Sequence, residues 1–355
     1  MSIREVKKIV KAIQTSDGAG VKLKRSMGVP ELDFIDPFLM FDEFGSENKD
    51  DYIAGFPPHP HRGIETVTYM LAGRFKHEDS TGSKGEMGSG SVQWMTAAGG
   101  IIHSEMPIMK EGKLHGFQLW VNMPAKLKMS KPYYQNIEPE KIPEFNDKEK
   151  KIKIIAGKYE GKIGPAKGFV DPIYLDIELE KEKTFNYIIP SSHNVFIYLV
   201  YGEIKIGNKN HNKLKNSTLI CLTDGGNLKI SSIKKSQFLI IAGKPIGEPG
   251  PEEVLIEHKA IGLNFIDTYH RSGLYPLELP SGIGGEGSGI IKAVGSKVKG
   301  FSVGDSIAYA GAPLGSYSSD RIYPIKNLVK IPDGVNFDVA ATAMTKGLTA
   351  YYLLY

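Results

Sequence analysis

Cysteine and long apolar runs are what this sequence most clearly lacks. A single cysteine, Cys221, occurs among 355 residues, which excludes an intrachain disulfide framework and favours a reducing compartment. No apolar run reaches the ~18 residues that a transmembrane helix needs, and residues 1–18 have neither the apolar core nor the cleavage site of a signal peptide. These absences predict a cytoplasmic protein that does not enter a membrane.

Arginine is scarce as well. The chain has 44 lysines and arginines against 40 acidic residues, for a net charge of +4, and only six of the basic residues are arginine. The lysines are interleaved with acids, as in EFNDKEKKIK, whereas nucleic-acid-binding proteins gather positive charge on one face. We therefore expect a solvated, lysine-rich surface and no direct nucleic-acid partner.

Sustained helical periodicity is nearly absent before residue 335. Forty glycines and 21 prolines punctuate short β-branched and aromatic runs such as IETVTYML, NVFIYLVY and SQFLIIAG. Short strands between turn residues are typical of a β-sandwich or β-barrel. The sequence therefore predicts a mainly β protein.

One segment of the sequence recurs. TVTYMLAGRFK at 66–76 resembles VFIYLVYGEIK at 195–205, with a tyrosine, a glycine and a lysine coinciding at an offset of 129 residues. Prolines and glycines crowd residues 245–251, as at a domain junction, and a helical segment is predicted at 335–355. We predict two β-barrels followed by a smaller β domain with a C-terminal helix: 1–130, 131–248 and 249–355.

Two pairs of ligand-type residues stand out among only nine histidines. They are His59-x-His61 and His103-x-Glu105, and on a strand residues i and i+2 share one face. Two such pairs on adjacent strands would form a pocket of three imidazoles and one carboxylate. That donor set suits Fe(II), Mn, Ni, Cu or Zn, so the pattern predicts a transition-metal site without selecting the metal.

The repeat provides an internal control for this site. At the offset of 129 the second copy has side chains that cannot replace the four candidate ligands, which predicts a metal in the first barrel alone. These positions are Ile188, Pro190, Ser232 and Lys234. We expect His193 and His211 of the second copy to lie on the surface.

Other residues near the two pairs have two interpretations. Glu65 either orients an imidazole from behind the ligands or is a surface or strand-pairing residue. We expect His77 and His115 to be ordinary, satisfied histidines of the first barrel. Four aromatic residues either wall an apolar pocket or pack in the core: Phe56, Trp94, Phe117 and Trp120.

Three stretches resemble the pirin family, whose members have two cupin β-barrels. They are GFPPHPHRGIETVTYMLAGRFKHEDSTG, GSVQWMTAAGGIIHSEMP and HGFQLWVNMPAKLKMSKPYYQ, and the likeness runs from about residue 2 to 249. The resemblance implies one mononuclear iron, or another divalent metal, in the N-terminal barrel. It also implies that the ligand positions are those of His59, His61, His103 and Glu105.

Two functions follow from this resemblance, since some pirins have quercetin 2,3-dioxygenase activity and others sense redox state or bind proteins. The leading hypothesis is an Fe(II)-class dioxygenase acting with O2 on flavonol-like, enolisable aromatic substrates. Glu105 would also serve as general base for the substrate hydroxyl. The alternative is a non-enzymatic, iron-binding redox sensor with a protein partner. We expect a monomer.

The last hundred residues contain a literal G-x-G-x-x-G, at Gly282, Gly284 and Gly287. A dinucleotide-binding fingerprint needs a strand before it and a helix that opens within it. The neighbouring sequence predicts strands and turns instead. We therefore interpret these residues as turn glycines.

The region from EVLIEHKAIGLNF to VKIPDGV resembles the GroES-like domain of zinc-free quinone oxidoreductases, in the medium-chain dehydrogenase superfamily. The resemblance implies that Asn264, Asp267 and Tyr269 match positions near the NADPH nicotinamide and the quinone. It also implies no zinc, because Asn264 replaces the ligand cysteine. We expect this domain to be truncated before a Rossmann domain, so that NADPH binding and quinone reduction by this chain alone are not expected.

Overall fold

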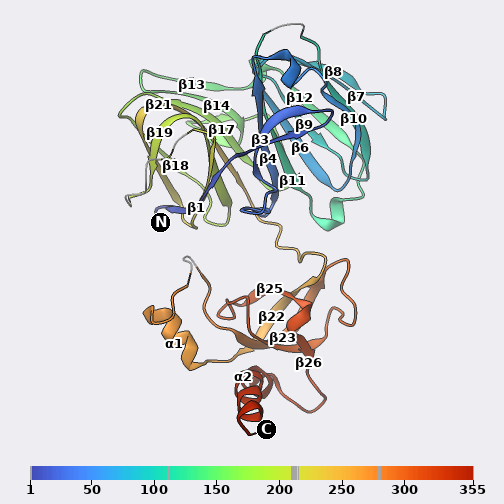
Figure 1. The fold of residues 1–355 in the computed structure, drawn as a ribbon, viewed down its shortest axis with the longest axis vertical. Coiled ribbons are helices and arrows are strands. Elements are labelled where there is room, and N and C mark those ends of the chain that lie inside the picture. Colours follow the sequence, from blue (N-terminus) through green and yellow to red (C-terminus); the bar gives the residue numbers. More distant parts are fainter. Residues whose placement is uncertain (1, 110–111, 209–213, 215, 278–280, 355) are drawn as a thin grey trace. The chain divides into compact units, whose positions relative to one another are not determined.

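The computed structural model describes the chain except residues 1, 110–111, 209–213, 215, 278–280 and 355. The chain divides into two compact units, Met1–Ile246 and Gly247–Tyr355. Strands predominate in both units (Figure 1), which confirms the mainly β prediction. Neither described α-helix has the length and apolarity that a membrane crossing requires.

The first barrel consists of two sheets. The seven-stranded sheet has the order β12 (Tyr133–Ile137), β9 (Val92–Thr96), β6 (Ile64–Ala72), β11 (Leu114–Asn122), β4 (Phe38–Ser46), β3 (Val21–Met27) and β2 (Ile13–Asp17). The four-stranded sheet has the order β5 (Phe56–His61), β10 (Ile101–Pro107), β7 (Phe75–Asp79) and β8 (Lys84–Met87). Leu23 and Phe44 of the larger sheet pack with Phe75 and Met87 of the smaller one, so the two sheets enclose a shared core.

The second barrel is one eight-stranded sheet. Its order is β1 (Val6–Lys11), β20 (Thr218–Leu222), β19 (Asn194–Ile206), β21 (Asn227–Gly243), β17 (Ile173–Leu179), β14 (Lys150–Ala156) and β13 (Glu144–Asn146), with β18 (Thr184–Ile188) also paired to β21. The long strand β21 pairs with β18 at one end and with β17 at the other, so the sheet folds over an aliphatic core. A small hairpin, β15 (Lys158–Tyr159) and β16 (Lys162–Ile163), completes this region.

Apart from their outermost strands β12 and β1, the two large sheets have the same topology: β9-β6-β11-β4-β3-β2 in one corresponds to β20-β19-β21-β17-β14-β13 in the other. The sequence repeat therefore reflects a repeated fold. β6 and β19, which carry the repeated segment, occupy the third position of each sheet. The predicted boundary at residue 130 does not follow the strand pairing, however. β1 pairs with β20 of the second barrel, and β12 pairs with β9 of the first. Each barrel thus takes one edge strand from the other half of the chain, and edge pairing leaves no signature in a local hydrophobic pattern.

Short 3-10 turns connect the strands: η1 (Lys49–Asp51), η2 (Ala125–Leu127), η3 (Pro139–Lys141) and η4 (Ile325–Asn327). His193, expected on the surface, is instead buried at 3% exposure, and its ring contacts the Asp171 carbonyl at 2.9 Å. His211 lies outside the described residues.

The second unit has a five-stranded sheet and two helices. The sheet order is β25 (Asp320–Pro324), β22 (Glu253–Ile261), β23 (Glu286–Val294), β24 (Ser306–Ala310) and β26 (Leu328–Lys330), and the helices are α1 (Phe265–Ser272) and α2 (Phe337–Leu354). The segment after Gly284 enters β23 and not a helix, so Gly282 and Gly284 lie outside the regular elements, as expected of turn glycines. For Gly287 the prediction is wrong, because this residue lies within β23 and is paired with Tyr309. Gly284 has a φ of +90°, a conformation that favours glycine.

Two buried tyrosines join the barrels in a reciprocal way. Tyr69 on β6 donates a hydrogen bond to Asp176 on β17 (2.7 Å), and Tyr198 on β19 donates one to Glu43 on β4 (2.8 Å). The tyrosines are the two that coincide in the sequence repeat. Each repeat therefore places its tyrosine against a carboxylate of the other barrel, inside an apolar interface where an unpaired polar group is costly.

Glu43 is at the centre of a larger polar network. Its carboxylate accepts hydrogen bonds from the His115 ring (2.9 Å), Tyr198 (2.8 Å), Ser217 (3.1 Å) and Lys24 (3.3 Å). Burial alone would raise the pKa of Glu43, but the hydrogen bonds from His115 and Tyr198 and the charge of Lys24 lower it to about 2.

The Tyr69 bond leads to a stability prediction. Tyr69→Phe keeps the ring and removes the donor, which leaves the Asp176 carboxylate less satisfied in the interface. We expect the free energy of unfolding to fall by about 1–3 kcal/mol, measured by chemical denaturation. Tyr133→Phe is the control, because Tyr133 is 42% exposed. An unchanged denaturation midpoint for Tyr69→Phe would contradict the role of this bond.

Glu43 leads to a pH prediction. A carboxyl whose pKa is about 4.5 when unfolded and about 2 when folded stabilises the fold above pH 4.5, and this contribution is lost as the pH falls toward 2. We expect Glu43→Gln to lower the free energy of unfolding at pH 7 by about 3 kcal/mol and to flatten its decline between pH 4.5 and 2. The exposed Glu182→Gln should do neither, and equal pH profiles for Glu43→Gln and wild type would refute the assignment.

Candidate metal centre

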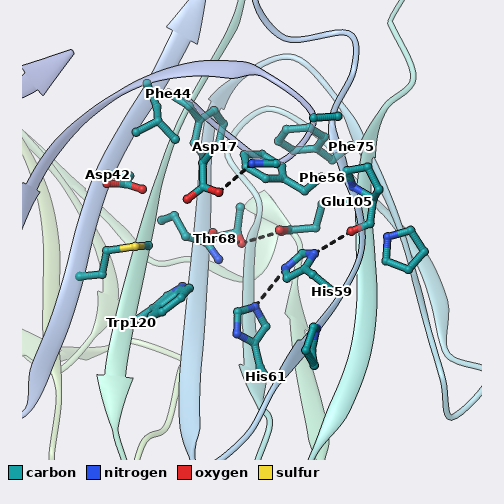
Figure 2. A pocket seen from close by; sticks show the side chains of 18 residues that line it. Asp17, Asp42, Phe44, Phe56, His59, His61, Thr68, Phe75, Glu105 and Trp120 are labelled. Atoms are coloured by element: carbon teal, nitrogen blue, oxygen red, sulfur yellow. Dashed lines mark hydrogen bonds between the residues drawn. The ribbon is translucent and has the colours of Figure 1, made fainter. Parts of the chain in front are cut away.

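A cavity of about 500 Å³ opens between the two sheets of the first barrel (Figure 2). Its wall is largely apolar, and a few polar side chains meet at one end. The lining includes Leu23, Met40, Phe44, Phe56, Phe75 and Trp120, with His59, His61, Thr68, Glu105 and Gln118 as polar groups. An apolar cavity with a small convergent polar cluster is the usual form of a small-molecule site.

The candidate pocket aromatics divide into two pairs. Phe56 and Trp120 line the cavity, as the first interpretation predicts, and the Trp120 ring lies 5.1 Å from the His61 ring. Trp94 and Phe117 are both buried in the hydrophobic core that spans the two barrels. Strand alternation explains why Phe117 and Trp120 differ. They are an odd number of positions apart on β11, so their side chains point to opposite faces of the sheet, one toward the core and one toward the cavity.

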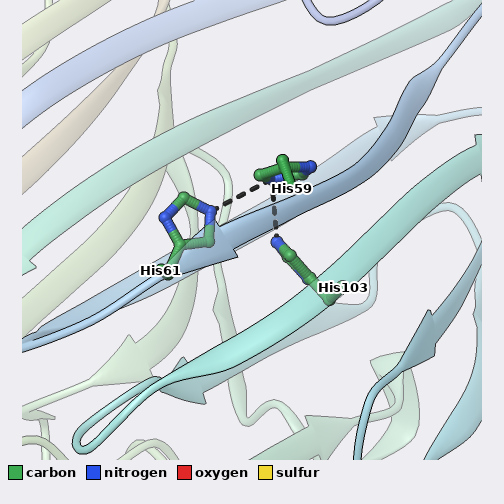
Figure 3. Close-up of side chains that lie close together, drawn as sticks. All are labelled: His59, His61 and His103. Atoms are coloured by element: carbon green, nitrogen blue, oxygen red, sulfur yellow. Dashed lines mark hydrogen bonds between the residues drawn. The ribbon is translucent and has the colours of Figure 1, made fainter.

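Three histidines converge beside this cavity from two strands (Figure 3). His59 on β5 is paired with His103 on β10, and His61 is paired with Ile101. The Nε2 atom of His59 lies 3.1 Å from that of His61 and 3.0 Å from that of His103. Among the described residues these three are the ones whose ligand-type atoms all lie within 4.8 Å of one another.

Local contacts prepare these rings to act as ligands. The Nδ1 atom of His59 lies 2.8 Å from the Pro57 carbonyl, which accepts a proton only from the tautomer with a bare Nε2. Burial, together with the charge of the neighbouring histidines, lowers the pKa values of His61 and His103 to about 3. Neutral imidazoles with convergent lone pairs are the form that binds a divalent transition metal.

Glu105, the fourth predicted ligand, faces the same cavity but is held differently. Its carboxylate accepts a hydrogen bond from Thr68 at 3.0 Å, and Thr68 also contacts Gln118 at 2.6 Å. Glu105 is 5% exposed, and burial raises its pKa. The structure thus brings three of the four predicted groups into one cluster and places the fourth beside it in the cavity.

Glu65 lies within β6 and is paired with Thr96 of β9, which agrees with the strand-pairing interpretation. It does not line the cavity, and its side chain is fully buried, with the Thr96 hydroxyl donating to it at 2.8 Å. Burial raises its pKa to about 7. His115 lies away from the cavity and bonds to Glu43, as expected for a satisfied structural histidine.

A third pair of residues two apart escaped the sequence reasoning. His77 and Asp79 lie on β7 directly opposite Glu105 and His103 of β10. His77 is fully buried, and neither of its ring nitrogens has a hydrogen-bond partner among the described residues. The signal was present in the sequence as H-x-D, at the same spacing as the two ligand pairs.

The second barrel has no comparable cluster among its described residues. Ile188 is 65% exposed there, and the Ser232 hydroxyl bonds to backbone carbonyls. The residues at the offset of 129 thus have surface or backbone-binding environments in the second barrel, and they do not converge on one point.

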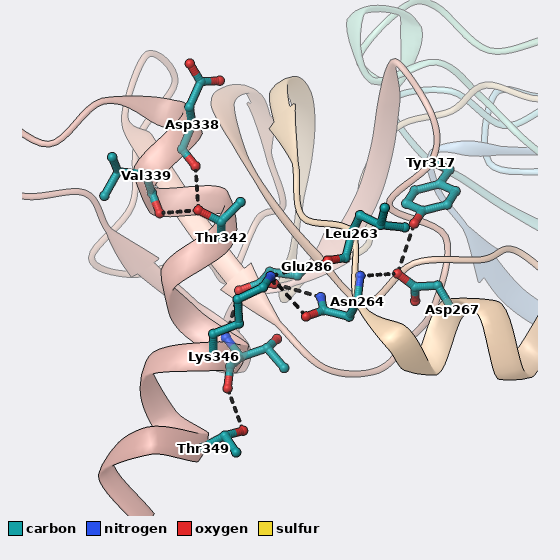
Figure 4. Close-up of polar contacts among 11 residues, drawn as sticks. Leu263, Asn264, Asp267, Glu286, Tyr317, Asp338, Val339, Thr342, Lys346 and Thr349 are labelled. Carbon is teal, nitrogen blue, oxygen red and sulfur yellow. Dashed lines mark hydrogen bonds and ion pairs between the residues drawn. The ribbon is translucent and has the colours of Figure 1, made fainter.

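The three candidate residues of the second unit take part in local contacts, and Figure 4 shows the polar contacts of Asn264 and Asp267. Asn264 donates to Glu286 (2.8 Å) and accepts from Lys346 (3.2 Å). Asp267 accepts from the Asn264 amide and from Tyr317, both at 2.9 Å, so it caps helix α1. Tyr269 packs its ring against Tyr275.

Comparisons with known proteins follow the division into units. Residues 20–121 match the family model for pirin, residues 174–251 the model for the pirin C-terminal cupin domain, and residues 250–333 the GroES-like domain of alcohol dehydrogenase. Both resemblances noted in the sequence are thereby confirmed.

Individual relatives agree with these matches. A pirin-like protein of Caulobacter vibrioides is 44% identical over 252 residues, or 70% of this chain and 90% of that protein. A Pseudomonas aeruginosa protein, whose name provisionally assigns it as a quercetin 2,3-dioxygenase, is 43% identical over 69% of this chain and 88% of its own length.

The solved structure of Escherichia coli quinone oxidoreductase with NADPH is 49% identical, with a TM-score of 0.30, over 30% of this chain and 33% of that one. The first unit matches both pirin models and aligns with nearly the whole length of a pirin-like relative. The chain therefore belongs to the pirin family, and its cupin barrels are followed by a GroES-like domain.

Proposed function

We propose that this chain is a metal-dependent dioxygenase that acts on flavonol-like substrates. The observation that carries the proposal is the convergence of the Nε2 atoms of His59, His61 and His103 beside an apolar cavity of about 500 Å³. The name of the Pseudomonas aeruginosa relative supports the same activity.

A single divalent transition metal fits this donor set. The three imidazole nitrogens would bind it, and Glu105 would complete the set as an oxygen ligand from the same strand as His103. Nitrogen and carboxylate donors with open positions suit Fe(II) among the metals of this class, so we propose Fe(II). When bound, the metal would supply Lewis acidity toward the substrate hydroxyl and redox chemistry toward O2.

The chain's own residues would do the remaining work. Phe44, Phe56 and Trp120 would hold a planar aromatic molecule and keep water away from it. The carboxylate of Glu105 would accept the proton of the substrate hydroxyl. The Thr68 hydroxyl would hold one carboxylate oxygen in place during the transfer.

This proposal concerns the first unit and assigns no activity to the second. A non-enzymatic redox sensor would use the same metal site, so the two functions differ only in substrate turnover.

The metal site is tested by removing one ligand at a time. His59→Ala and His103→Ala should each reduce bound iron from about one equivalent to a small fraction, measured by elemental analysis after anaerobic loading. His270→Ala, in α1 of the second unit, is the control and should retain full occupancy. Full iron content in the His103→Ala protein would refute the proposed site.

The enzymatic role is tested through Glu105. We expect iron-loaded wild type to consume quercetin and O2 together, and Glu105→Gln to lower the turnover number by about 10²–10⁴-fold through loss of the general base. The measurement is flavonol absorbance with an oxygen electrode, and Glu86→Gln on the exposed side of β8 is the control. Full iron occupancy in wild type without quercetin loss would favour the redox sensor instead.

A further inference from the structure

The four-stranded sheet arranges its inward-facing residues in rows that cross three strands. His59, His103 and Asp79 occupy paired positions on β5, β10 and β7 and so form one row. Paired residues of antiparallel strands point to the same face with Cβ atoms about 5 Å apart. Asp79 is therefore the neighbour of His103 on the side opposite to His59.

His103 has an unsatisfied atom on that side. Its Nε2 atom faces His59 at 3.0 Å, whereas its Nδ1 atom is buried and has no hydrogen-bond partner among the described residues. His103 as a whole is 2% exposed. An imidazole that gives Nε2 to a metal carries its proton on Nδ1, and that proton needs an acceptor when it is buried.

Asp79 has one saturated oxygen and one that is unsatisfied. Its Oδ1 atom accepts from the Thr81 amide (2.7 Å), the Thr81 hydroxyl (2.7 Å) and the Ser83 amide (3.0 Å). These three bonds fix the carboxylate to the turn after β7. Its Oδ2 atom is buried and has no partner in the described part of the chain.

Tyr134 closes the space behind this pair. Its ring stacks on His77 with centroids 5.3 Å apart. Its hydroxyl forms no hydrogen bond of ordinary geometry with the described residues, but it lies close enough to Asp79 to be among the groups that lower the pKa of that carboxyl. Asp79 thus has two potential donors beside it, the Tyr134 hydroxyl and the ring of His103, and the latter occupies the strand position directly paired with Asp79.

We infer that Asp79 is a positioning residue for the metal centre, and that its Oδ2 atom accepts a hydrogen bond from the Nδ1–H of His103 when the metal is bound. This bond selects the tautomer of His103 and holds its Nε2 atom toward the other two histidines. The inference rests on the proposed metal site. It adds to that site a residue of β7, to which none of the comparisons assigns a role.

Asp79→Asn tests this role with little change of shape. Asparagine keeps the Oδ1 acceptor for the turn, but it places an NH2 group where His103 needs an acceptor. Co²⁺ is the probe, because its visible absorption spectrum reports coordination geometry without any catalytic turnover. We expect the Co²⁺ dissociation constant to rise about 10–100-fold, with an altered spectrum and an unchanged melting temperature of the metal-free protein.

Glu78→Gln is the matched control. Glu78 is the adjacent residue on the opposite face, where it pairs with Lys76 at 2.6 Å, and its substitution should leave Co²⁺ affinity within twofold. A second measurement avoids any dependence on how the variant folds: in the Zn²⁺-loaded wild type, the Nδ1 proton of His103 should give a slowly exchanging, downfield NMR signal.

The outcomes separate the two proposals. Wild-type affinity and spectrum for Asp79→Asn, or a rapidly exchanging Nδ1 proton, would overturn the positioning role and leave the metal site standing. Failure of the wild type to bind one equivalent of Co²⁺ would overturn the metal site itself, and the role of Asp79 with it.

Discussion

The register between β5 and β10 is the constraint on which the candidate site depends. His59 is paired with His103, and because side chains alternate along a strand, a slip of one residue would turn one whole set of histidines outward. The slip would also expose Ile101, which is buried beside the cluster. The same apolar contacts that stabilise the barrel therefore hold the three imidazoles together, so the site does not need the metal to define its geometry.

The second barrel contributes through its contacts rather than through ligands of its own. Phe41 of the first barrel lies 5.5 Å from Phe196 and 4.9 Å from Tyr198 of the second, by ring centroids. The tyrosine–carboxylate bonds at either side give this apolar interface a unique alignment, since a shifted interface would bury their polar atoms unpaired. The strands that bear these contacts, β4 and β6, also wall the cavity through Phe44 and Thr68. Rigidity in the second barrel thus supports the shape of the first.

The sequence predicts much of this structure, and the exceptions have physical causes. The spacing of His59, His61 and His103 was enough to predict their cluster, because strand alternation is a local property. Asp79 was overlooked, and His77 was wrongly expected to be satisfied, since neither of its ring nitrogens has a partner among the described residues. The surroundings of both residues depend on which strand lies next to β10, and pairing is not local. For Glu65 the strand-pairing interpretation holds, but nothing near it in the sequence reveals that the neighbouring strands bury its side chain completely. The edge strands β1 and β12 were likewise assigned to the wrong halves.

Because the barrels exchange edge strands, a gene fragment that encodes only one half of residues 1–246 cannot encode a complete barrel. A recombination or cleavage event between them, near residue 130, would strip β12 from one barrel and leave β1 attached to the wrong fragment. Neither half would inherit a complete sheet, and each would expose a row of unpaired backbone groups. The smallest piece of this molecule that can be copied, moved or joined to another domain is therefore the pair of barrels together. The junction with the GroES-like unit falls immediately after that pair.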